Sequence, residues 1–195
     1  PDRLLFGLGI PYVGQTVAKR MGKVILELGG NNAIIVTEHA NLATAIPAIV
    51  FGSVGTAGQR CTTTRRIIVH DNIYQQVKDS LIKAYQSIRI GNPLDTSNHM
   101  GPLIDTAAVD TMQNSLKQAE QQGAQVIYGG QTLEGEQYSS RCYVEPTILE
   151  AKNEMPIVQE ETFAPILYMI RYSGEVEDAI ELQNNVRQGL SSAIF

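Results

Sequence analysis

Cys61 is the residue in this chain best placed to act as a nucleophile. It lies in the segment GTAGQRCTTT, residues 55–64, which is rich in small side chains. Small residues let a backbone approach a ligand closely, and the adjacent Arg60 favours the nucleophilic thiolate form of a cysteine. A small buried cysteine would suit the same segment equally well, so both interpretations stay open. Cys142 stands in a strand-like run and favours the buried interpretation.

Two acidic segments could work beside such a thiol. Glu27 is the single acid in the apolar run VILELGG, residues 24–30. A carboxylate is costly to bury alone, so Glu27 either has a partner, activates water as a general base, or faces solvent from an edge strand. The second segment, QEETFAP, contains Glu161 and Phe163. Its carboxylates could accept hydrogen bonds from ribose hydroxyls and its aromatic ring could pack against a flat heterocycle, although paired acids also form solvated turns.

Other kinds of site find little support in the sequence. The three histidines, His39, His70 and His99, have no metal-ligand spacing with one another or with the cysteines, so we expect no zinc site. The spacing of Gly7, Gly9 and Gly14 does not match the dinucleotide-binding fingerprint.

Composition narrows the class of protein. The chain has 195 residues, with 15 Lys+Arg against 20 Asp+Glu, a formal net charge of −5. This acidic balance argues against nucleic acid and anionic membrane surfaces as partners. No apolar run approaches the roughly 20 residues that span a bilayer, so we expect no membrane segment. Two cysteines far apart in sequence suit a reducing compartment, and we therefore expect a cytoplasmic protein.

The elements that must position these residues alternate along the chain, because the apolar period switches repeatedly between about 2 and about 3.6. Strands are expected over Lys23–Leu28, Ala33–Val36, Arg66–His70, Gln125–Tyr128, Tyr143–Leu149, Ile166–Ile170 and Ser191–Phe195. Helices are expected after Asn41, from Asp71 or Asn72 as the cap to Ile88, over Thr106–Gln122, and from Ser173 to Gly189. Pro47 should kink the first helix or delay its start. The alternation predicts an α/β fold with a largely parallel sheet and helices on both faces.

Three motifs together resemble the aldehyde dehydrogenase superfamily. They are ELGGNN at 27–32, GQRC at 58–61 and ETFAP at 161–165, in this order. The longer segment 51–66 resembles the antiquitin branch, the α-aminoadipic semialdehyde dehydrogenases, and GLSS at 189–192 agrees. The resemblance covers about residues 21–195. It implies a parallel-sheet catalytic domain of the aldehyde dehydrogenase type.

The resemblance also implies a reaction, the NAD(P)-dependent oxidation of a small aldehyde, such as a semialdehyde, to a carboxylic acid. Cys61 would form a thiohemiacetal and then a thioester, and Glu27 would activate the water that hydrolyses the thioester. NAD is the expected coenzyme, and NADP stays open. Glu161 would hold the nicotinamide ribose, with Phe163 and Gly29 also on the coenzyme side. Arg60 would contact the charged far end of the substrate.

The resemblance implies a domain division as well. Residues 1–30 would be a remnant of the coenzyme-binding domain or a connecting segment. Residues 31–195 would be the thiol-bearing catalytic domain, truncated at its C-terminus, from a full-length protein expected to be a homo-oligomer. Two alternatives stay open: a catalytically silent domain with a binding or assembly role, and a cysteine hydrolase, for which Cys61 lacks a convincing histidine partner.

Overall fold

Six strands of the computed structural model, which describes residues 28–195, hydrogen-bond into one sheet with the order β3-β4-β5-β2-β1-β6. The strands are β1 Asn32–Val36, β2 Thr64–His70, β3 Gln125–Tyr128, β4 Thr147–Glu150, β5 Ile166–Tyr172 and β6 Ser192–Ile194. Every neighbouring pair is parallel except β3 with β4. The predicted α/β fold with a largely parallel sheet is confirmed.

The central strands are buried on both faces. All five residues of β1 and all seven of β2 are buried. In the register of the sheet, Ile34 of β1 lies beside Ile67 of β2, which lies beside Met169 of β5. Strands buried on both faces require cover on both sides, as in α/β proteins generally.

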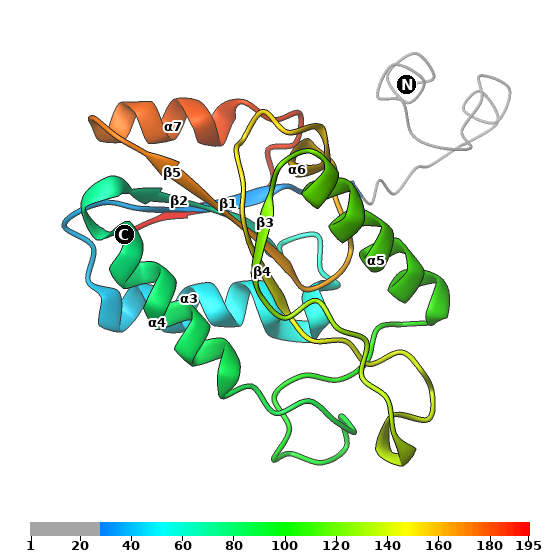
Figure 1. Ribbon diagram of the computed structural model, residues 1–195. Helices are drawn as coiled ribbons and strands as arrows, with labels where there is room; N and C mark the ends of the chain where they lie inside the picture. Colours follow the sequence, from blue (N-terminus) through cyan, green and yellow to red (C-terminus); the bar gives the residue numbers. More distant parts are fainter. Residues whose placement is uncertain (1–27) are drawn as a thin grey trace, which may run out of the picture.

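Helices supply that cover (Figure 1). The helices are α3 Leu42–Val54, α4 Tyr74–Gln86, α5 Thr106–Gln121, α6 Pro156–Gln159 and α7 Val176–Asn184. In the view of Figure 1, α3 and α4 lie below the sheet and α7 lies above it. The buried residues of α4, which include Val77, Leu81 and Tyr85, recur at helical spacing and form its core-facing stripe. No helix within the described residues is long and apolar enough to cross a membrane.

One helix starts where the sequence predicts and another does not. Helix α3 begins directly after Asn41, whose side chain accepts a hydrogen bond from the Ala43 N–H, and it continues through Pro47. The cap expected at Asp71 or Asn72 is wrong. Residues 71–73 instead form a 3₁₀ turn, opened by the ring of His70 accepting from the N–H of Asn72, and α4 begins one residue later.

Two expected elements are shorter in the structure. Strand β4 begins only at Thr147, directly after Pro146, which has no N–H to contribute to a ladder. Helix α7 begins with a capping box formed by Glu175 and Asp178 and ends at Asn184, so the segment from there to Gly189 is not helical. The strand expected over Lys23–Leu28 lies almost wholly outside the described residues, and the division near residue 30 stays a prediction.

Candidate active site

The half-buried Cys61 thiol lies on a turn between a 3₁₀ helix, Gly55–Gly58, and strand β2. Three consecutive residues before it adopt left-handed backbone conformations: Thr56, Ala57 and Gly58, with φ of 55°, 51° and 69°. Non-glycine residues rarely adopt this region, and such strain concentrates at functional sites. The turn leads from the end of α3 to the start of β2, and it places Cys61 just before this central strand of the sheet.

Gly58 allows this turn to pack against the segment after Glu161. A Cβ at Gly58 would lie 2.2 Å from the carbonyl oxygen of Ala164. We therefore expect Gly58→Ala to lower the free energy of unfolding by at least about 1–3 kcal/mol, from strain and backbone displacement together. Urea unfolding measures the change. The matched control is Gly189→Ala, where a Cβ meets nothing within 4 Å; equal effects of the two substitutions would contradict the prediction.

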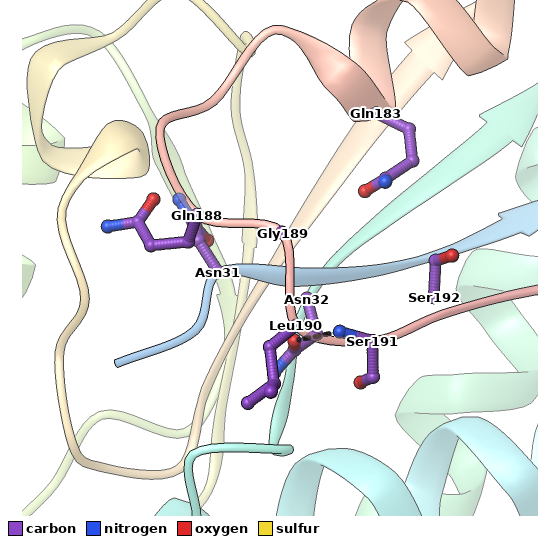
Figure 2. Close-up of a pocket in the computed structure, with 8 residues that line it drawn as sticks. All are labelled: Asn31, Asn32, Gln183, Gln188, Gly189, Leu190, Ser191 and Ser192. Carbon is purple, nitrogen blue, oxygen red and sulfur yellow. Dashed lines mark hydrogen bonds between the residues drawn. The ribbon is translucent and has the colours of Figure 1, made fainter. Parts of the chain in front are cut away.

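Asn32 ties the Cys61 loop to strand β1. Its side-chain N–H₂ donates to the carbonyl oxygens of Cys61 at 2.7 Å and Thr63 at 2.8 Å. Its side-chain oxygen accepts from the N–H of Ser191 at 3.0 Å, a bond drawn in Figure 2. Gly30 packs so closely that a Cβ there would lie 2.3 Å from the Cys61 carbonyl oxygen. The first and second motifs are therefore in direct contact, and Asn32 is a site residue that sequence analysis did not single out.

Glu161 lies against the same glycine turn. Its Oε1 accepts hydrogen bonds from the Gly30 N–H at 3.0 Å and from Nη2 of Arg65 at 3.2 Å. A Cβ at Gly29 would lie 2.0 Å from Oε2 of Glu161, so only glycine leaves room for this carboxylate. The structure thus brings Gly29 and Glu161, both expected on the coenzyme side, into contact.

Arg65 is a second site residue that sequence analysis missed. Its guanidinium is buried, forms an ion pair with Glu161 and lies 5.3 Å from the centre of the Phe163 ring. Burial lowers the pKa of Arg65, and the negative charge of Glu161 opposes that shift. The guanidinium also donates to backbone carbonyl oxygens of Gly30, Gly58, Arg60 and Thr162. The sequence did offer one signal for Arg65: it is a charged residue directly before the strand expected over Arg66–His70.

A cavity of about 500 Å³ lies beside Phe163. Its lining residues are Gln59, Pro102, Leu103, Ile104 and Phe163. The Phe163 ring is 45% exposed, so a face of it is available to a ligand. Gln59 holds the segment across the cavity, since its Oε1 accepts from the Ile104 N–H at 2.8 Å.

A second cavity, which is polar and has a volume of about 410 Å³, lies where the GLSS segment, residues 189–192, passes the start of strand β1 at Asn32 (Figure 2). Its lining residues are Asn31, Asn32, Gln183, Gln188, Gly189, Leu190, Ser191 and Ser192. Two buried side-chain oxygens at this cavity, Oδ1 of Asn31 and Oε1 of Gln188, have no hydrogen-bond partner among the described residues.

The other candidates are placed differently. The Arg60 side chain turns toward the end of α3, where Nε donates to Oγ1 of Thr56 at 2.8 Å and the guanidinium lies 5.2 Å from the centre of the Phe51 ring. Glu27 lies outside the described residues. Cys142 is buried, as expected. No group of three or more His, Cys, Asp or Glu side chains that could hold a metal ion occurs within residues 28–195.

Comparison with known proteins identifies the family. The model of the family described as "Aldehyde dehydrogenase family" matches residues 10–195. The chain belongs to this family. The mouse aldehyde dehydrogenase named alpha-aminoadipic semialdehyde dehydrogenase is 46% identical, over 98% of this chain and 36% of its own length. A Caenorhabditis elegans protein named as a homologue of aldehyde dehydrogenase family 7 member A1 is 51% identical, over 94% of this chain and 34% of its own length. The resemblance inferred from the three motifs is confirmed.

Solved aldehyde dehydrogenases share the fold. Betaine aldehyde dehydrogenase from Staphylococcus aureus, in a structure with NAD+, matches with a TM-score of 0.89 and 30% identity, over 98% of this chain and 38% of its own. 3,6-Anhydro-L-galactose dehydrogenase matches with a TM-score of 0.83 and 33% identity, over 86% of this chain and 35% of its own. This chain therefore spans about a third of the length of the aldehyde dehydrogenases that it resembles.

Proposed function

We propose that the protein carrying this chain oxidises an aldehyde to a carboxylic acid with NAD, and that this chain supplies the nucleophile and part of the coenzyme site. One observation carries the proposal. The Cys61 loop and the Glu161 carboxylate pack on the same Gly29-Gly30 turn, through the carbonyl oxygen of Cys61 on one side and the carboxylate on the other. A nucleophile and a polar anchor for a second molecule therefore lie on one turn.

The residues around Glu161 fit the nicotinamide ribose of the coenzyme. Oε1 of Glu161 is held by two donors, while Oε2 accepts no hydrogen bond from the described residues. The Glu161 side chain is 21% exposed, so Oε2 can accept from a ribose hydroxyl. The exposed ring of Phe163 follows two residues later and can pack against the flat nicotinamide end. The S. aureus relative was solved with NAD+, which supports NAD as the coenzyme, with NADP as the other candidate.

The proposed chemistry begins at Cys61. Its thiolate attacks the aldehyde carbon and forms a carbon–sulfur bond, giving a thiohemiacetal. The N–H of Cys61 donates to no group in the described part of the chain, so it can stabilise the oxyanion that develops. A bound nicotinamide coenzyme supplies the acceptor for the hydride that leaves the substrate. Glu27 takes a proton from water, which attacks the resulting thioester, and cleavage of the carbon–sulfur bond releases the acid and restores the thiolate.

We propose a semialdehyde of the α-aminoadipic type as the substrate. The names of the mouse relative and its family members support this substrate class. Arg60 stays the candidate contact for the charged end of the substrate. Its guanidinium is next to the nucleophile in sequence and is already oriented by Thr56 and Phe51.

Steady-state assays test the proposal. The full-length protein should reduce NAD when given α-aminoadipic semialdehyde, and the isolated 195-residue chain should not, because most of a relative's length is missing from it. Oxidation by the isolated chain would exclude the silent-domain alternative. Ester hydrolysis by the full-length protein without any coenzyme-dependent oxidation would reject the proposal in favour of a cysteine hydrolase.

Gly29→Ala tests the coenzyme site separately. Its Cβ would displace the Glu161 carboxylate from the glycine turn, so we expect KM for NAD to rise about tenfold, a loss of about 1.4 kcal/mol. The change in kcat should be smaller. Gly91→Ala is the control, because its Cβ would likewise displace the end of a polar side chain, Nδ2 of Asn98 at 2.7 Å, which does not contact Glu161. An unchanged KM for NAD in Gly29→Ala would contradict the role of Glu161.

We also propose a cytoplasmic location and a homo-oligomeric full-length protein. Both cysteines are free, which supports a reducing compartment. Phe51 is 69% exposed beside a cavity of about 410 Å³ along α3, and exposed apolar area of this kind supports contact with another protein surface. Size-exclusion chromatography with light scattering tests the oligomeric state, and a monomeric full-length protein would reject it.

A further inference from the structure

The Arg65 side chain contacts all three of the segments that carry the family motifs. Toward the first motif, Nε donates to the carbonyl oxygen of Gly30 at 3.3 Å. Toward the second, Nη2 donates to the carbonyl oxygen of Arg60 at 3.1 Å, one residue before the nucleophile. Toward the third, Nη2 also donates to Glu161, and the guanidinium faces the ring of Phe163.

Only arginine suits this position. The Arg65 residue is 2% exposed, and a buried cation is costly unless it is paired and hydrogen-bonded. A guanidinium offers five N–H donors in a rigid planar fork, which allows one side chain to serve acceptors on different segments. A lysine ammonium is a single point with three donors and cannot reach all of them. Arg65 therefore links Gly30 to Glu161, which lies 131 residues later in the chain.

We propose that Arg65 is a positioning residue that holds the Glu161 carboxylate at a fixed place relative to the Cys61 loop. Through this contact, the coenzyme-binding group and the nucleophile are kept in one arrangement before either ligand enters. The inference rests on the coenzyme role proposed for Glu161. Arg65 donates no hydrogen bond to the Cys61 thiol, and its hydrogen bonds run to Glu161 and to backbone carbonyls that include that of Arg60.

Coenzyme binding to the full-length protein without aldehyde tests the first half of the inference. NADH fluorescence gives the dissociation constant for Arg65→Lys, for Glu161→Gln and for the double variant. We expect each single variant to bind about tenfold more weakly. The double variant should bind no more weakly than Glu161→Gln, because the two residues act as a unit. Arg171→Lys is the matched control: Arg171 also forms an ion pair, with Asp71 at 3.2 Å, and stacks on Tyr74, but it is exposed and far in the fold from these motifs.

Alkylation of Cys61 tests the second half without coenzyme. Iodoacetamide labelling of the ligand-free protein, followed at the Cys61 peptide by mass spectrometry, reports how firmly the loop is held. We expect Arg65→Lys to speed labelling severalfold, since the carbonyls of Gly58 and Arg60 lose their donor. Arg171→Lys should label at the unsubstituted rate.

Glu161→Asp keeps the inference testable if Arg65→Lys does not fold. It preserves the charge but withdraws the carboxylate by one methylene from Arg65 and the Gly30 N–H. Because the inference rests on the position of the carboxylate, Glu161→Asp should weaken NADH binding as much as Glu161→Gln does. Full NADH affinity in Glu161→Asp would overturn the inference. Multiplying effects in the double variant, or a lower Tm with unchanged NADH affinity and labelling, would also overturn it. Unchanged affinity in Glu161→Gln, with labelling still dependent on Arg65, would instead reject the coenzyme role proposed for Glu161.

Discussion

Cys61→Ala should reduce coenzyme-dependent aldehyde oxidation by the full-length protein at least about 10³-fold, because the covalent route to the acid needs the thiol. The half-buried Cys61 side chain donates no hydrogen bond within the described residues, so its removal should leave the fold intact. NADH affinity and Tm should therefore stay close to those of the unsubstituted protein. Steady-state NAD reduction, NADH fluorescence and thermal unfolding measure the three quantities.

Cys142→Ala is the matched control for the nucleophile. Cys142 is 8% exposed, and its thiol donates to the carbonyl oxygen of Ser140 at 3.2 Å, far in sequence from the Cys61 loop. We expect full oxidation activity with a small loss of stability. Substantial activity in Cys61→Ala, or an equal loss in Cys142→Ala, would reject Cys61 as the nucleophile.

Arg66→Met should have the largest effect on stability. Arg66 is fully buried in β2, and burial lowers its pKa to about 10. No carboxylate of the described residues pairs with it. It instead donates to the carbonyl oxygens of Asn31, Leu182 and Gln183 and to the side-chain oxygens of Asn153 and Gln183. Methionine fills the volume but leaves these acceptors without a donor, and we expect a loss of about 3–5 kcal/mol in the free energy of unfolding.

Chemical unfolding of Arg66→Met measures this loss, with Arg171→Met as the control. Arg171 is more than half exposed and pairs with Asp71 on the surface, so its substitution should cost less than about 1 kcal/mol. A cost for Arg66→Met below that of the control would show that the buried network contributes little to stability.

Elements with a strong apolar period were predictable from the sequence, whereas their ends depend on contacts made elsewhere. The stripe of Val77, Leu81 and Tyr85 in α4 and the buried run of β5 were expected, because they repeat at helical and strand spacing. Of the two effects expected of Pro47, the delayed start of α3 is wrong, and the kink stays a prediction. The helix continues through Pro47 because burial of Ala45, Ile49 and Val54 outweighs one missing hydrogen bond.

The motifs pointed to Cys61, Gly29 and Glu161, but the residues that hold them together were not predictable. Apart from the bond of Arg65 to Glu161, Arg65 and Asn32 act through backbone carbonyls and N–H groups. Almost any residue type presents such groups, so these partners leave no trace in the sequence. Arg65 reaches Glu161 across 96 positions, and Asn32 reaches Ser191 across 159. Such pairs of residues come into contact only when the sheet has brought β1, β2 and the segment before β5 together.

The bond from Ser191 to Asn32 has a consequence for synthesis on the ribosome. The Asn32 side chain donates to the carbonyl oxygen of Cys61, and its own oxygen accepts from the N–H of Ser191. Ser191 is synthesised 191 − 61 = 130 residues after Cys61. At translation rates of about 5–20 residues per second, this interval is roughly 6–30 s. A nascent chain therefore carries the Cys61 loop without this anchor for that time.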